Sequence, residues 1–169
     1  VSIKTGGLTV SAGVVTVTDG YIDVSDTSRN TRIGTNAGDS FSGTTTDNTL
    51  IGYDAGTAIT SGDSNTFVGS NTGENTTTAG NNTALGYTAL LTNSTGATNT
   101  AVGSAALYAN TTASDNTAVG YNALVANTTG ASNVSVGSYA LDANTTASGN
   151  TALGYQALTA NTTGDLNVA

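Results

Sequence analysis

The chain lacks proline, cysteine, methionine, tryptophan and histidine altogether, across 169 residues. Without cysteine and histidine it can form no disulfide and has none of the side chains that most often bind transition metals. Two of the commonest catalytic groups are absent with them, and the remaining ionisable residues are carboxylates, tyrosines and three cations. The sequence therefore predicts no enzyme activity, no catalytic residue and no cofactor.

Charge is also scarce, because charged residues make up only 8% of the chain and the formal net charge is −8. All three basic residues, Lys4, Arg29 and Arg32, precede position 33. The sequence thus offers no basic patch that could neutralise phosphates, and nucleic acids and anionic membrane surfaces are not expected as partners. No apolar run approaches the roughly 20 residues of a membrane-spanning helix, so no membrane insertion is expected.

Most of the chain consists of a 17-residue sequence repeat. A branched apolar residue followed by glycine marks each copy, and the glycines are spaced by 18 residues once and by 17 thereafter. They are Gly34, Gly52, Gly69, Gly86, Gly103, Gly120, Gly137 and Gly154. Self-similarity at a fixed period is typical of solenoids, in which stacked coils share a core. The last copy breaks off after three residues, so we expect the array, residues 28–169, to continue in a longer protein.

Each copy predicts one short strand. In NTAVGYNALVANTTGAS (116–132), the NTAVG stretch alternates and includes a β-branched residue, as short strands do. We expect the branched residue before each glycine, and the leucine five positions later, to form the repeat core. That core would be Val68, Leu85, Val102, Leu107, Val119, Leu124, Val136, Leu141, Leu153 and Leu158. Alternation would then turn alanines such as Ala101 and Ala118 outward, where a small side chain lets another chain approach closely.

Residues 1–27 follow a different rule. Apolar pairs such as Leu8/Val10 and Val15/Val17 recur every seven residues and are mostly followed by glycine. This is the alternation of short strands joined by glycine turns. We therefore expect a thin β shaft over residues 1–27, before the array.

The phrases NTAVGYNAL and NTALGYTAL resemble the repeat arrays of bacteriophage tail fibres. They are also similar to the left-handed β-roll repeats in the heads of trimeric autotransporter adhesins, and GLTVSAG and VVTVTDG resemble shaft segments of such fibres. The resemblance implies an all-β solenoid or β-roll of 17-residue coils, assembled as an intertwined or side-by-side parallel homotrimer. It implies a rigid spacer or adhesive stalk in the virion, with a host-surface glycan or protein receptor bound at the fibre tip.

Three other interpretations are consistent with the repeats. A bacterial cell-surface trimeric adhesin or extracellular filament would share the architecture and differ in its flanking domains. An ice-binding solenoid or a glycan-binding module would act through its own surface. Tail-fibre spacer is the favoured interpretation of the four.

A column of tyrosines follows alternate repeat glycines, at Tyr53, Tyr87, Tyr121 and Tyr155. A tyrosine ring can stack on a sugar and carries a polar tip, so the column could form a glycan-contact surface. The same rings could instead cover a groove between neighbouring chains. We favour the groove.

Aspartates do not form a column that would favour calcium binding. Asp115, Asp142 and Asp165 occupy different positions in their copies, so the sequence predicts no metal site in the array. A single site near Asp19, Asp23 and Asp26 is left as an alternative.

Four copies contain the turn sequence NTT, which begins at Asn110, Asn127, Asn144 and Asn161. Each matches the acceptor pattern for N-glycosylation. The threonines could also form an ice-binding array, although adjacent residues of a strand point to opposite faces. We favour a structural turn held by stacking of asparagines and threonines.

Overall fold

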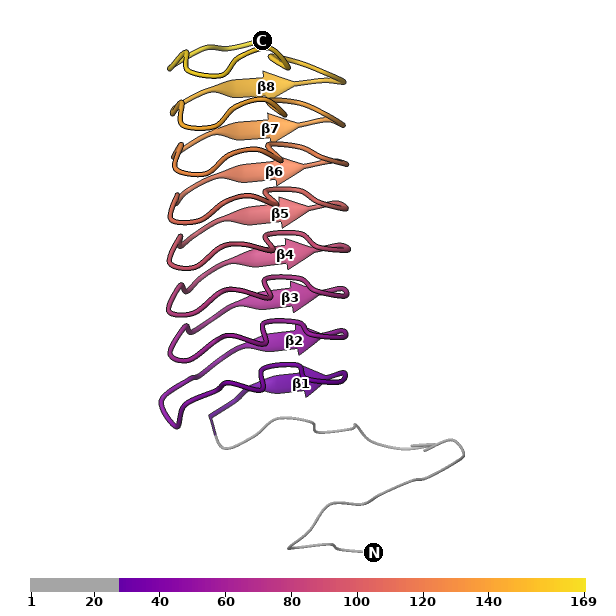
Figure 1. Cartoon of the computed structure of the whole chain (residues 1–169), viewed down its shortest axis with the longest axis vertical. Coiled ribbons are helices and arrows are strands. Elements are labelled where there is room, and N and C mark those ends of the chain that lie inside the picture. Colours follow the sequence, from indigo (N-terminus) through magenta and orange to yellow (C-terminus); the bar gives the residue numbers. More distant parts are fainter. Residues whose placement is uncertain (1–27) are drawn as a thin grey trace, which may run out of the picture.

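The computed structural model describes residues 28–169 as a tower of stacked coils, with one strand in each of eight coils (Figure 1). The eight strands form one parallel sheet in chain order. Their bounds are β1 Thr31–Ile33, β2 Thr49–Ile51, β3 Thr66–Val68, β4 Thr83–Leu85, β5 Thr100–Val102, β6 Thr117–Val119, β7 Val134–Val136 and β8 Thr151–Leu153. The predicted all-β solenoid with 17-residue coils is confirmed. The shaft expected over residues 1–27 lies outside the described residues.

Equivalent residues lie above one another throughout the tower. Between β5 and β6, for example, Ala101 pairs with Ala118 and Val102 with Val119. The first coil carries one extra residue, so Ile33 pairs with Ile51 at an offset of 18. The backbone amide of Thr46 donates a hydrogen bond to the carboxylate of Asp63, which is 17 residues later. The offset has therefore returned to 17 by Thr46, so the extra residue lies in the loop between β1 and Thr46. A loop insertion therefore leaves the register of the sheet intact.

Strands β2 to β8 place their middle residue in the core and turn the branched residue outward, whereas Arg32, the middle residue of β1, is exposed. Ala101 and Ala118 are fully buried, whereas Leu85 and Leu153 are 38% and 72% exposed. The structure thus reverses the predicted alternation at six positions: Val68, Leu85, Val102, Val119, Val136 and Leu153 are all exposed or half-buried. In the fourth to eighth coils the cause is a leucine at the far side of the coil, which already fills the narrow interior opposite the strand. In the second and third coils the middle strand residue itself, Leu50 or Phe67, fills that interior.

That leucine is the main apolar residue of the later coils. Leu107, Leu124 and Leu141 are fully buried, and Leu158 is half-buried against the same core. Each has a left-handed backbone, with φ of 54° at Leu124, a conformation that costs a bulky residue roughly 1 kcal/mol. The left-handed turn directs the side chain into the coil, and its burial offsets the backbone cost.

Two core positions share one space, and which of them holds the large side chain differs between coils. We number each coil from the asparagine before its strand, which makes the buried strand residue position 3 and the left-handed leucine position 9. In the third coil these are Phe67 and Gly73, and a Cβ on Gly73 would lie 2.3 Å from the Phe67 ring. In the fourth coil they are Ala84 and Leu90. A large residue at one position therefore requires a small one at the other, as close packing demands.

Candidate interaction surfaces

The described residues contain no enclosed site. No cavity is found in residues 28–169, and no three acidic groups there come together in a way that could hold a metal ion. The same residues include no helix long and apolar enough to cross a membrane.

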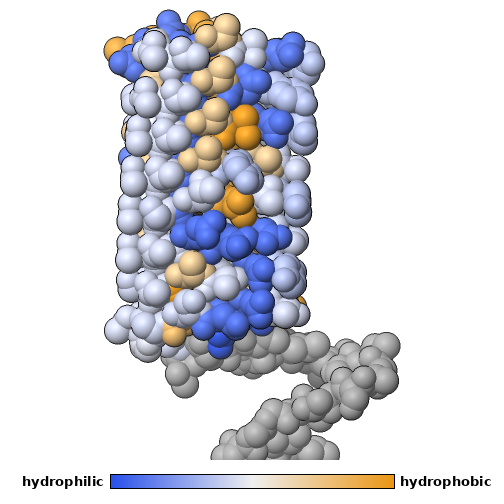
Figure 2. Space-filling view, viewed as in Figure 1, coloured by the Kyte–Doolittle hydropathy of each residue, from blue (hydrophilic) through white to orange (hydrophobic). Residues whose placement is uncertain are grey.

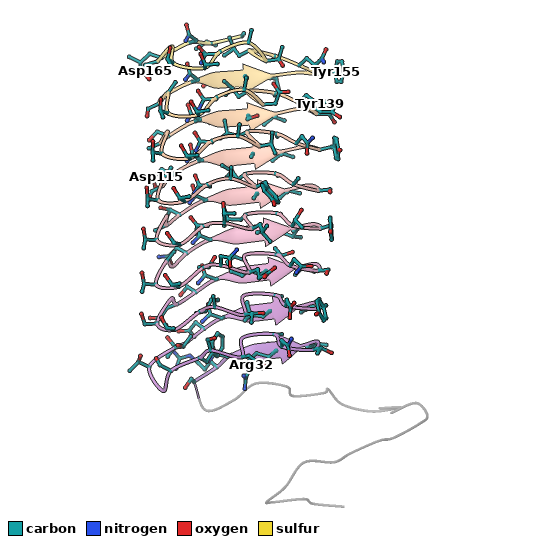
Figure 3. All side chains as sticks on the ribbon, viewed as in Figure 1. Arg32, Asp115, Tyr139, Tyr155 and Asp165 are labelled. Atoms are coloured by element: carbon teal, nitrogen blue, oxygen red, sulfur yellow. The ribbon has the colours of Figure 1, made fainter. Side chains whose placement is uncertain are left out.

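The aspartates considered for calcium bind neighbouring coils instead. Asp115 accepts a hydrogen bond from the Thr98 hydroxyl at 2.8 Å, and Asp165 accepts one from the backbone amide of Ser148 at 2.7 Å. Asp115 and Asp165 lie on one edge of the tower, opposite Tyr139 and Tyr155 (Figure 3). Their carboxylates link successive coils. The other suggested group, Asp19, Asp23 and Asp26, lies outside the described residues.

The two described cations are also engaged within the first coils. Arg29 forms a bidentate ion pair with Asp47, with N···O distances of 2.6 and 2.7 Å. The pair is exposed; its hydrogen bonds hold the pKa of Asp47 below the usual value and raise that of Arg29. Arg32 lies over the Phe41 ring, 5.3 Å from its centroid. Each arginine thus has a local partner within the chain.

Asparagine forms a continuous hydrogen-bonded column inside the tower. The residue at position 1 of every coil is buried: Asn30, Asn48, Asn65, Asn82, Asn99, Asn116, Asn133 and Asn150. Each side-chain oxygen accepts from the next asparagine; Asn116 Oδ1, for example, accepts from the Asn133 backbone amide at 2.9 Å. The Asn116 amide group donates in turn to the Gly130 carbonyl at 2.9 Å. The column therefore ties each coil to the next and to its own turn.

The NTT asparagines form a second column beside the first. Asn110, Asn127 and Asn144 are fully buried, and the Nδ2 of Asn127 donates to Asn110 Oδ1 at 3.0 Å and to the Gly130 carbonyl at 2.9 Å. The following threonines also bond between coils, as Thr111 Oγ1 donates to the Thr128 carbonyl at 3.0 Å. The turn is thus the stacked structure that we favoured. Nδ2, the atom that N-glycosylation would modify, is enclosed at these three asparagines.

The outward side of the strands is the most regular apolar surface of the tower. Its column is formed by the branched residues at position 4: Ile33, Ile51, Val68, Leu85, Val102, Val119, Val136 and Leu153. A column at position 2 runs beside it, with half-buried threonines in seven of the eight coils and the exposed Val134 in the seventh. By contrast, the face shown in Figure 2 is largely hydrophilic or weakly polar, and its strongly hydrophobic residues are few and separate. We call the columns at positions 2 and 4 together the outer strand face.

Tyrosines form the second candidate surface. The predicted column is exposed throughout, by 54% at Tyr53, 62% at Tyr87, 49% at Tyr121 and 70% at Tyr155. The structure adds Tyr139, whose ring packs edge-to-face against Tyr121 at 5.3 Å and against Tyr155 at 6.3 Å between centroids. Partial burial of the ring and the neighbouring Tyr121 raise the pKa of Tyr139. Tyr139 was not predicted from the sequence, because it stands at position 7, one place after the tyrosine column.

Comparison with known proteins adds no relative. No protein-family model, no curated protein and no solved structure matches the chain.

Proposed function

We propose that this chain is a structural segment of a bacteriophage tail fibre, in which three parallel copies associate through their outer strand faces. The observation that supports this assembly is the aliphatic column at position 4. Eight branched residues in a row face away from the chain's own core, and large contiguous apolar surfaces of this kind are uncommon on monomers. A second and third copy would remove them from water.

The repeat supports parallel association in register. Position 4 residues of successive coils are separated by about 4.8 Å, the spacing of paired strands. In a parallel arrangement with matching coils, the two columns would meet along their whole length, with equivalent residues at the same height. The threonines at position 2 lie beside each branched residue on the same side of the strand, because side chains two apart share a face. They would border the apolar seam with short, weakly polar groups.

The stacked architecture supports the proposed mechanical role. From β1 to β8 the seven steps advance the tower by about 34 Å at one strand spacing per coil. Adding or removing a whole coil changes this length without altering the contacts of any other coil. Such a segment holds a receptor-binding fibre tip away from the virion and requires no catalytic group of its own.

Cysteine cross-linking tests the assembly, and the natural chain contains no cysteine that would interfere. We expect Val119→Cys, placed on the outer strand face, to give covalent dimers after mild oxidation, because equivalent residues meet at the seam. Asp115→Cys is the matched control, since Asp115 is exposed at an edge of the tower (Figure 3). Absence of dimers for Val119→Cys, or equal yields for the two variants, would argue against the seam.

A specific observation favours ice binding as the second candidate. The outer strand face is a regular array of threonine and aliphatic side chains over eight coils, a pattern that could order water along one side of a single chain. A seam between chains would cover this face, so the two functions exclude each other. Thermal hysteresis in a freezing assay, from a protein with the mass of one chain, would favour ice binding. A bacterial surface adhesin would share the fibre's assembly and be distinguished by its flanking domains.

A further inference from the structure

The tyrosine surface contains one local arrangement that the repeat does not produce elsewhere. In most coils position 7 holds a small or polar residue, such as Asn71 between Tyr53 and Tyr87. In the seventh coil position 6 is Ser138 and position 7 is Tyr139, so an aromatic ring fills the gap between Tyr121 and Tyr155. Three rings from three consecutive coils therefore form one cluster.

We propose that Tyr121, Tyr139 and Tyr155 form a binding platform for a neutral oligosaccharide. The two edge-to-face contacts hold the middle ring at 78° and 88° to its neighbours. Its backbone has a left-handed φ of 59° and is fixed by the coil. A rigid ring loses little conformational entropy when a ligand binds, and it offers an apolar face together with a hydroxyl.

Polar side chains around the rings can bind sugar hydroxyls. Asn122 and Gln156 occupy position 7 in the coils on either side of Tyr139. Asp142 is near enough to Tyr139 to influence its pKa, and its Oδ1 accepts a hydrogen bond from Thr159 at 2.5 Å. Side-chain amides, a carboxylate and phenol groups beside exposed rings match a ligand with apolar C–H faces and many hydroxyls.

The surrounding charge argues for a neutral ligand. Every basic residue of the chain precedes position 33, and the acidic Asp142 is near enough to Tyr139 to raise its pKa. Sulfated, phosphorylated or sialylated glycans would meet no cation here and would be repelled by the carboxylate. The cluster spans two coil steps, about 10 Å, along an open edge of the tower, which suits an extended oligosaccharide bound from the side.

The chain provides matched variants for a test. Tyr53→Ala removes a lone ring at position 6 and serves as the control for Tyr139→Ala, which removes the centre of the cluster. Ala105→Tyr should build a second cluster, because Ala105 lies between Tyr87 and Tyr121, follows a serine and has a φ of 55°, close to that of Tyr139. This gain-of-binding variant keeps the test decisive if Tyr139→Ala does not fold.

The probes are immobilised neutral oligosaccharides of glucose, galactose, mannose and N-acetylglucosamine, with sulfated counterparts. We expect the full chain to bind at least one neutral probe, and Tyr139→Ala to weaken that binding about tenfold. Tyr53→Ala should leave it unchanged, and Ala105→Tyr should increase the amount of probe bound per chain. Absence of binding to all neutral probes, preference for the sulfated ones, equal loss in Tyr53→Ala, or no gain in Ala105→Tyr would each overturn the proposal. The number of chains in the assembly is measured separately, so that failure of this proposal and failure of the trimeric fibre can be distinguished.

Discussion

Replacing Asn116 by aspartate is expected to lower the free energy of unfolding by about 3 kcal/mol or more, although the two side chains have nearly the same shape. Asn116 is fully buried, and its Nδ2 donates to the carbonyl oxygen of Gly130. An aspartate would direct an oxygen at that carbonyl and place a negative charge in the coil interior. Chemical denaturation followed by circular dichroism measures the loss.

The control for this substitution is Asn122→Asp. Asn122 lies at position 7 of the same coil and has a left-handed φ of 54°. Asp54 occupies the equivalent position of the second coil naturally, with a φ of 53°. We expect this variant to differ from the natural chain by less than about 0.5 kcal/mol. If the two aspartate variants had similar stabilities, the buried asparagine column would not hold the coils together as described.

Replacing the buried strand residue Ala84 by phenylalanine should be strongly destabilising alone, and it should be tolerated when Leu90 is replaced by glycine in the same chain. Ala84→Phe would force a ring into the space that Leu90 fills, and overpacking of this kind costs about 1–3 kcal/mol or more. Leu90→Gly alone would leave a cavity and lower the free energy of unfolding by about 3 kcal/mol. Part of that loss would be offset, because glycine adopts the left-handed backbone of position 90 without the strain that leucine has there. The double variant reproduces the Phe67 and Gly73 pair of the preceding coil and should recover most of the loss.

A double-mutant cycle in denaturant measures this coupling. We expect the two single losses to exceed the loss in the double variant by about 2 kcal/mol, because the residues share one volume. Additive losses would show that positions 3 and 9 do not compensate each other. The same cycle at Asp115 and Ala84, which lie at different positions of different coils, should be additive and provides the control.

The period and the fold class were predictable from the sequence, because a 17-residue repeat with one short alternating stretch permits few arrangements other than stacked coils. The direction of the strand faces was not predictable from alternation. Alternation separates Ala118 from Val119 without saying which of them is inside. The deciding factor is Leu124, which occupies the interior of the same narrow coil and leaves room only for a methyl group opposite. The sequence pattern correctly predicted that the leucine at position 9 is buried, and it wrongly predicted burial of the branched residues at position 4.

The buried asparagine column and the position of Tyr139 were not predicted from the sequence, for two different reasons. Asparagine is ordinarily a surface residue, so the strict recurrence of Asn99, Asn116 and Asn133 at position 1 was not interpreted as burial. A polar group at every period can be satisfied in the interior, because each copy supplies the partner of the next. Tyr139 stands outside the tyrosine column, and only the stacking of coils brings it between two rings that lie 34 residues apart in sequence.

The outer strand face links the fold to the proposed function, and its role depends on how many chains associate. The most direct measurement is the absolute mass of the full 169-residue chain in solution, by light scattering on a sizing column. We expect a mass of three chains, about 50 kDa from the 16.5 kDa of one. A mass of one chain, from a protein with the circular dichroism of a β fold, would contradict the trimeric fibre.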